Sequence, residues 1–263
     1  MNSFLWVAGG TGFIFLMTSL GSSMVFFFRK QTGRLLQTIF LGFAAGIMIS
    51  ASVFGLLVPA IAEAEAKGET GWLPAAGGFV LGVLFLLLLD KLIPHLHPSS
   101  NTREGLSSSL KRTTLLVSAV TLHNIPEGMA VGLSFALAAN HSGDVAAYSS
   151  AMALALGIGI QNFPEGAAVA LPLRREGFSA RKSFLLGCLS GLVEPVFGLL
   201  VVFIAAFIAP FMPWLLAFAA GAMLYVVVEE LIPEAHLGEH SNVGTLAVMA
   251  GFLVMMVLDV ALG

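Results

Sequence analysis

Residues 113–139 read TTLLVSAVTLHNIPEGMAVGLSFALAA, an apolar run that holds a histidine, an asparagine and a glutamate near its middle. A helix needs about 20 mostly apolar residues to cross the hydrocarbon core of a bilayer. Residues 145–173 form a second run of this kind, with QNFPEG at its centre. Ionisable groups at that depth mark ion pathways and buried sites in membrane proteins. The two runs therefore predict membrane-spanning helices with a polar centre.

The whole chain has the composition of a membrane protein. Of its 263 residues, 57% are hydrophobic and only 10% are charged, and the mean hydropathy is +0.94. A soluble domain normally carries about 25% charged residues. We therefore predict an all-α membrane protein in which residues 1–263 form one transmembrane domain. The small net charge of −3 gives no reason to expect nucleic acid as a partner.

Eight apolar segments are long enough to be helices that cross the bilayer. They lie at about 4–28, 35–62, 71–89, 113–139, 145–173, 183–209, 211–228 and 243–260. The longest polar connection, at about 94–112, joins the third and fourth spans. Eleven of the twelve Lys and Arg residues fall in the three loops on one side, and only Lys67 falls on the other. The positive-inside rule makes the first side cytoplasmic, so both termini are expected outside the cytoplasm.

Two internal repeats relate spans of opposite direction. GFAAGIM at 42–48 in the second span returns as AFAAGAM at 217–223 in the seventh, 175 residues later. This offset predicts an inverted repeat of spans one to three against spans six to eight, as in many transporters. Small residues also recur in any packed membrane helix, which is the alternative explanation. In the central pair, HNIPEG at 123–128 returns as QNFPEG at 161–166.

Three glutamates lie deep inside spans four, five and six: Glu127, Glu165 and Glu194. A charge at this depth costs about 2.5–3.5 kcal/mol on insertion scales. The three side chains must therefore face each other, and a divalent cation would offset their repulsion. Protonated glutamates that pair without a metal are the alternative.

The spacing of the neighbouring polar residues fits metal ligands. His123 stands four residues before Glu127 and Gln161 four before Glu165, so each pair shares one helix face. These nitrogen and oxygen donors suit zinc, cadmium, iron and manganese ions. The amides Asn124 and Asn162, about 100° further round each helix, predict an adjoining second ion. Pro126 and Pro164 are each expected to kink their helix and free a carbonyl beside the ligands.

A second group of polar residues closes spans three and seven. DKLIPHLH at 90–97 and EELIPEAH at 229–236 share the form acid-x-Leu-Ile-Pro followed by histidine. They are candidates for a metal exit or regulatory site, and polar helix ends at the interface are the alternative. The candidate ligands are Asp90, His95, Glu229, Glu230 and His236.

The motif H-N-x-P-E-G in span four with x-N-x-P-E-G in span five resembles that of the ZIP (Zrt/Irt-like) metal transporters, and is most similar to the bacterial GufA-like branch. Glu194-Pro195 in span six and the eight spans extend the resemblance over nearly the whole chain. The resemblance implies a homodimer in the bacterial inner membrane and an elevator-like motion of spans one, four, five and six. It also implies two metal positions that share Glu127 and Glu165. The first adds His123 and Gln161, and the second adds Asn124, Asn162 and Glu194.

The first functional hypothesis is therefore a transporter that takes divalent transition metal, zinc foremost, into the cytoplasm, with the inward direction implied by the resemblance. Channel-like permeation through the same site is an alternative. An intramembrane metalloenzyme is another, because His and Glu also hold catalytic zinc. The zincin motif H-E-x-x-H is absent, so no enzyme is expected. A structural membrane scaffold, which would bind no metal, is the remaining reading.

Overall fold

The structure is a computed structural model that describes residues 3–28, 34–92, 95–96, 103–104, 112–140, 144–235 and 242–262. Almost all of these residues are helical. Among them, strands occur in one two-residue antiparallel ladder, which pairs β1 (His95–Leu96) with β2 (Arg103–Glu104). The prediction of an all-α protein is confirmed.

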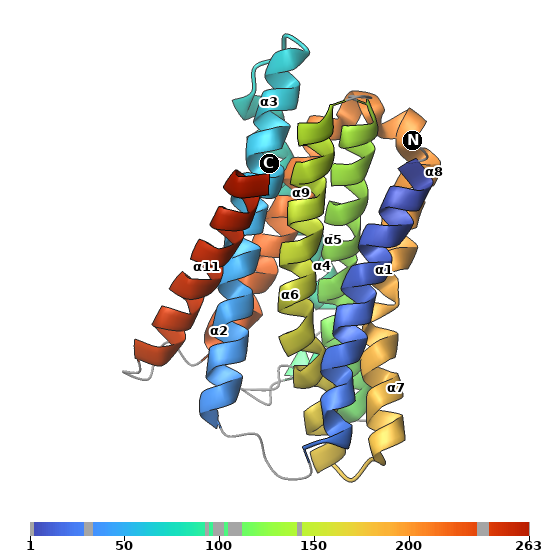
Figure 1. The fold of residues 1–263 in the computed structure, drawn as a ribbon, viewed down its shortest axis with the longest axis vertical. Coiled ribbons are helices and arrows are strands. Elements are labelled where there is room, and N and C mark those ends of the chain that lie inside the picture. Colours follow the sequence, from blue (N-terminus) through green and yellow to red (C-terminus); the bar gives the residue numbers. More distant parts are fainter. Residues whose placement is uncertain are drawn as a thin grey trace.

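The helices run back and forth along the length of the molecule, and both ends of the chain lie at the end that carries α3 (Figure 1). The major helices are α1 (Ser3–Ser22), α2 (Arg34–Ser50), α3 (Val58–Ala66), α4 (Trp72–Leu92), α5 (Arg112–Asn140), α6 (Val145–Arg175), α7 (Ala180–Gly191), α8 (Val193–Ile208), α9 (Met212–Val226) and α11 (Asn242–Leu262). Short helical turns join or extend them: η1 (Ser23–Phe26), η2 (Ala51–Leu57), η3 (Ala209–Phe211), η4 (Val227–Leu231) and α10 (Ile232–Glu234).

Six helical stretches within the described residues are by themselves long and apolar enough to cross a membrane. They are Phe4–Phe26, Leu35–Ala66, Trp72–Leu92, Ala180–Ile204, Ala209–Leu231 and Asn242–Leu262. The helices α5 and α6 are longer, with 29 and 31 residues, but they are less apolar because they hold the polar motifs. The membrane assignment is confirmed, whereas the count of eight spans stays a prediction.

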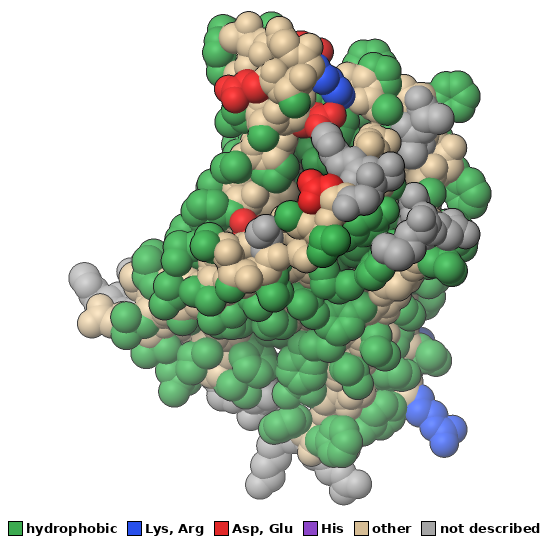
Figure 2. Space-filling model, turned by 45° about the horizontal axis from the view of Figure 1, so that its top comes forward, with side chains coloured by type: hydrophobic (Ala, Val, Ile, Leu, Met, Phe, Trp, Pro, Cys, Tyr) green, Lys and Arg blue, Asp and Glu red, His purple; other side chains and the backbone are tan. Residues whose placement is uncertain are grey.

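The flanks of the molecule carry a surface suited to lipid. Large hydrophobic side chains stand out from several helices there, among them Phe27, Phe207 and Val260, which are 80%, 81% and 72% exposed. Figure 2 shows hydrophobic side chains over most of the visible flank and acidic ones gathered at the end with α3. A soluble monomer rarely exposes apolar patches of this extent.

The helices pack in two groups that lie side by side (Figure 1). In the flanking bundle, α2 packs along α11 and α4 along α9, with α3 against α9. In the motif bundle, α1 packs along α6 and α5 along α8, with α7 against α6 and α1. The groups meet where α6 contacts α2 and α11 and where α5 contacts α9. An inverted repeat exchanges spans one to three with spans six to eight. It would map the α2–α11 pair onto the α4–α9 pair, and the α1–α6 pair onto the α5–α8 pair.

Equivalent glycines allow close approaches in the two halves of the flanking bundle. A Cβ on Gly46 of α2 would lie 2.0 Å from the carbonyl oxygen of Val248 in α11. A Cβ on Gly221 of α9 would lie 2.2 Å from that of Phe79 in α4. Gly46 and Gly221 are separated by the predicted 175 residues, so the matched contacts support the inverted repeat, which stays a prediction. Small residues of this kind let membrane helices approach closely.

Helix geometry is irregular in spans two, six and seven. The segments η2 and η4 are π-helical and occur in spans two and seven, at matching places in the proposed repeat. Span six is interrupted at Leu192, just before Glu194-Pro195, where α7 ends and α8 begins. By contrast, α5 and α6 run without interruption past Pro126 and Pro164, so the kinks predicted there stay predictions.

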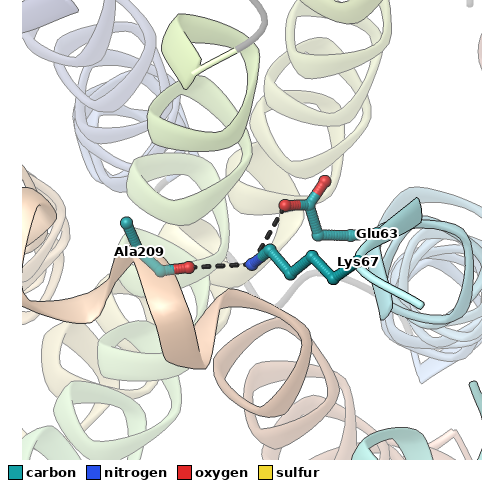
Figure 3. A network of polar contacts seen from close by, with 3 residues as sticks. All are labelled: Glu63, Lys67 and Ala209. Atoms are coloured by element: carbon teal, nitrogen blue, oxygen red, sulfur yellow. Dashed lines mark hydrogen bonds and ion pairs between the residues drawn. The ribbon is translucent and has the colours of Figure 1, made fainter. Parts of the chain in front are cut away.

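A short turn at the acidic end joins the two bundles. The three residues of η3 connect α8 of the motif bundle to α9 of the flanking bundle. Lys67, which follows α3, donates a hydrogen bond from Nζ to the carbonyl oxygen of Ala209 at 2.9 Å, and its Nζ lies 3.1 Å from Oε1 of Glu63 (Figure 3). Lys67 therefore ties α3 to this turn. It is the one basic residue that the sequence places on this side.

Candidate metal site

The seven predicted ligands of the mid-membrane site lie inside the molecule. Three come from α5, three from α6 and one from the first turn of α8, and none is more than 7% exposed. They are His123, Asn124, Glu127, Gln161, Asn162, Glu165 and Glu194. This burial is what polar groups at mid-membrane depth require, because contact with lipid would leave them without partners.

The two repeated motifs meet through Gln161 and Glu127. The amide nitrogen Nε2 of Gln161 donates to Oε1 of Glu127 at 2.5 Å and to Oδ1 of Asn162 at 3.2 Å. The carboxylates of Glu165 and Glu194 lie close enough to interact electrostatically with that of Glu127. Three acidic side chains from three helices therefore share one buried layer, as the sequence predicts.

Glu194 reaches this layer because α5 and α8 approach closely. A Cβ on Gly128 would lie 2.3 Å from the carbonyl oxygen of Glu194, so only glycine fits there without displacing backbone. Thr18 of α1 donates a hydrogen bond from Oγ1 to Oε1 of Glu194 at 2.9 Å. Thr18 was not predicted from the sequence, because a threonine inside an apolar run gives no signal of a site.

Asn124 is held by the last turn of α7. Its Nδ2 donates to the carbonyl oxygen of Ser190 at 3.0 Å, which leaves its Oδ1 free to accept. Ser190 lies just before the break in span six, and this backbone contact could not be found from side-chain types.

Four oxygens of the predicted ligands are buried without a hydrogen-bond partner in the part of the chain that the structure describes. They are Oδ1 of Asn124, Oε2 of Glu127, Oε1 of Gln161 and Oε2 of Glu194. A buried acceptor without a partner costs about 1–3 kcal/mol. Such oxygens on three adjacent helices are suited to a bound cation, because a metal ion satisfies several acceptors at once.

His123 links this layer to one of the secondary candidates. Its Nε2 lies 2.6 Å from Oε1 of Glu230, which belongs to η4 in the flanking bundle. Both side chains are buried. Glu230 therefore belongs with the primary site, although the sequence suggested only an exit or regulatory role for it.

The other secondary candidates are spread over different environments. Asp90 of α4 is buried and accepts a hydrogen bond on Oδ2 from the hydroxyl of Tyr225 at 2.6 Å. Glu229 is exposed. The side chain of His95 and the whole of His236 lie outside the described residues. The structure thus brings Glu230 to the primary site and leaves Glu229 away from the interior.

The ligands are not gathered into a finished coordination shell. Among the described residues, no three His, Cys, Asp or Glu side chains are placed so that they could hold a metal ion together. The contacts above give the reason, since His123 is paired with Glu230 and Gln161 directs its NH₂ group at Glu127. Metal binding would require these two contacts to rearrange.

Comparison with known proteins identifies the family of this chain. Residues 97–259 match the family described as ZIP Zinc transporter. Zinc transporter ZIPB of Bordetella bronchiseptica is 40% identical over 260 positions, which cover 98% of this chain and 81% of that protein. Zinc transporter GufA of Myxococcus xanthus is 39% identical, covering 80% of this chain and 81% of its own. Human zinc transporter ZIP11 is 36% identical, covering 97% and 96%. The chain therefore belongs to the ZIP family of zinc transporters.

Proposed function

We propose that this protein takes zinc, or a related divalent transition metal, across the membrane into the cytoplasm through two adjoining mid-membrane positions. Family membership makes it a membrane transporter of zinc and not an enzyme. The first position consists of His123, Glu127, Gln161 and Glu165. The second consists of Asn124, Asn162 and Glu194, with Glu127 and Glu165 shared between the two ions.

The four buried acceptor oxygens without partners carry this proposal. Each belongs to a predicted ligand, and they come from three different helices. Glu127 and Gln161 supply the first position, whereas Asn124 and Glu194 supply the second. An assembly of protonated glutamates is the alternative, and it would bind no metal.

The pairing of His123 with Glu230 supports a route out of the site. His123 shares one face of α5 with Glu127, and it already contacts an acid of the flanking bundle. A metal held by His123 and Glu127 can pass to Glu230 when His123 moves from the Glu127 side to the Glu230 side. Asp90 lies in the last turn of α4, on the side that the positive-inside rule makes cytoplasmic.

Cadmium, iron and manganese suit the same nitrogen and oxygen donors and are further candidate substrates. We also expect a homodimer of single-domain subunits in the bacterial inner membrane, with both termini extracytoplasmic. Cross-linking of the purified protein and accessibility labelling of cysteines placed at each terminus test these expectations.

Zinc flux into proteoliposomes tests the site. In the double variant Glu127→Ala/Glu165→Ala, the initial rate should fall at least about tenfold, because each carboxylate serves both ions. Glu69→Ala removes an exposed acid from the turn after α3 and serves as the matched control. Zinc flux at the wild-type rate in a folded double variant would show that the site is wrong.

Two further measurements separate the finer alternatives. Equilibrium dialysis should give two zinc ions per chain, and one after Glu194→Ala. Saturable flux with counterflow of labelled zinc indicates a carrier, whereas flux that rises linearly with zinc concentration indicates channel-like permeation.

A further inference from the structure

A groove opens between α2 and α6, on the side of the molecule where α2 begins and α6 ends. One face of α6 lines it at steps of three and four residues, from Pro164 to Arg175. The first turns of α2 form the opposite wall through Leu36, Gln37, Phe40 and Leu41. The groove therefore lies where the motif bundle meets the flanking bundle.

The lining is apolar along most of the groove and polar at one end. Ala167, Ala168 and Leu171 follow Pro164 along α6, and Arg175 closes the series at the helix end. Gln37 lies near the start of α2, at the same end of the molecule. The groove thus combines an apolar trough with a cationic mouth, which is the pattern of an amphiphile with an anionic head.

The length of the groove matches one leaflet of the bilayer. The eleven steps from Pro164 to Arg175 correspond to about 16 Å along α6, at about 1.5 Å per residue. Half of a hydrocarbon core about 30 Å thick is about 15 Å. Pro164 belongs to the mid-membrane motif, so Arg175 lies at the depth of the lipid phosphates. Basic pockets between membrane helices at this depth bind phospholipid headgroups.

From this match of length and charge, we infer that the groove binds one phospholipid, with its phosphate on Arg175 and an acyl chain along α6 as far as Pro164. The occupant is an anionic phospholipid such as phosphatidylglycerol, because further basic residues on this side, such as Arg181 and Lys182, add to the attraction. The acyl chain would lie between the two bundles and one residue from the ligand Glu165. The lipid would therefore act on the packing beside the metal site, and its binding does not depend on metal transport.

Native mass spectrometry of the full-length protein, delipidated in detergent and titrated with dioleoyl phosphatidylglycerol in the absence of metal, tests the site. The wild type should retain one lipid tightly. Arg175→Gln should lower the affinity about fivefold, the change expected for one cation near a lipid phosphate. Arg174→Gln is the matched control, since Arg174 donates from Nη1 to the carbonyl oxygen of Phe178 and does not line the groove.

A second variant acts on the apolar part. Ala168→Leu fills the trough without changing the charge, and it should also release the lipid while the thermal unfolding temperature stays near that of the wild type. Equal lipid retention in the wild type, Arg175→Gln and Ala168→Leu would overturn the inference, as would several weakly held lipids with no tight one. A wild type that retains the lipid but carries no zinc flux would count against the proposed transport function and not against the groove.

Discussion

The hydrogen bond from Thr18 to Glu194 offers a sharp test of the second metal position. Thr18→Val removes the hydroxyl and keeps the shape of the side chain. The retained methyl matters, because a Cβ built on Gly191 would lie only 2.9 Å from Cγ2 of Thr18, so α1 and α7 pack tightly here. In the described residues, Oε2 of Glu194 has no partner, and Oε1 would lose the hydroxyl that holds it.

The expected magnitude follows from the contact. A hydrogen bond to a charged group contributes about 1.5–3 kcal/mol. Thr18 also directs its hydroxyl to the carbonyl oxygen of Ile14 at 3.2 Å, so the bond to Glu194 is shared and the lower value applies. About 1.4 kcal/mol corresponds to a factor of ten. We therefore expect the second zinc ion to bind about tenfold more weakly, in line with the loss of a group that orients a metal ligand.

Isothermal titration of the purified protein with zinc measures this change. The first position should keep its affinity for zinc, so the binding of the second ion can be followed separately. Thr18→Ser retains the hydroxyl and should bind both ions as the wild type does. Thermal unfolding of both variants separates a local effect from misfolding.

Two outcomes would refute the reasoning in different ways. If Thr18→Val binds both ions normally while Glu194→Ala loses one, Thr18 does not position the ligand. If Glu194→Ala also keeps both ions, the second position does not include Glu194.

Three further predictions concern packing, the outer turn and the route of release. Gly166→Ala should lower the free energy of unfolding by about 1–3 kcal/mol, because its Cβ would lie 2.0 Å from a carbonyl oxygen of α1. A Cβ on Gly12 would meet nothing within 4 Å, so Gly12→Ala should unfold at the wild-type temperature in the same thermal assay. Lys67→Met should lower zinc flux up to about fivefold, because it releases the turn between the bundles. This factor corresponds to the free energy that a partly exposed ion pair contributes. Unchanged flux would show that the contacts of Lys67 are dispensable. Glu230→Gln frees His123 from its acidic partner, so zinc should bind more tightly at equilibrium but turn over more slowly; weaker binding in dialysis would argue that Glu230 itself holds the ion.

The sequence by itself determined the environment of this protein and the three acidic residues at its buried centre. Composition and the apolar runs required a helical membrane protein, since no other local structure satisfies the backbone of such segments in lipid. The buried glutamates at 127, 165 and 194 had to face inward because a charge in lipid is costly, and the structure buries all three. The i, i+4 spacing placed His123 and Gln161 on the same faces as their glutamates.

Only the tertiary structure decided which groups touch. Thr18 and Ser190 enter the site through contacts between helices far apart in the chain, and neither residue type announces such a role. Glu230 and its neighbour Glu229 look alike in sequence, yet Glu230 reaches His123 and Glu229 is exposed. The π-helical turn η4 contains both residues, and its packing against α9 and α2 sets which of them faces α5. Periodicity within one helix identifies a face, whereas the partner of that face depends on how the glycines let the helices approach.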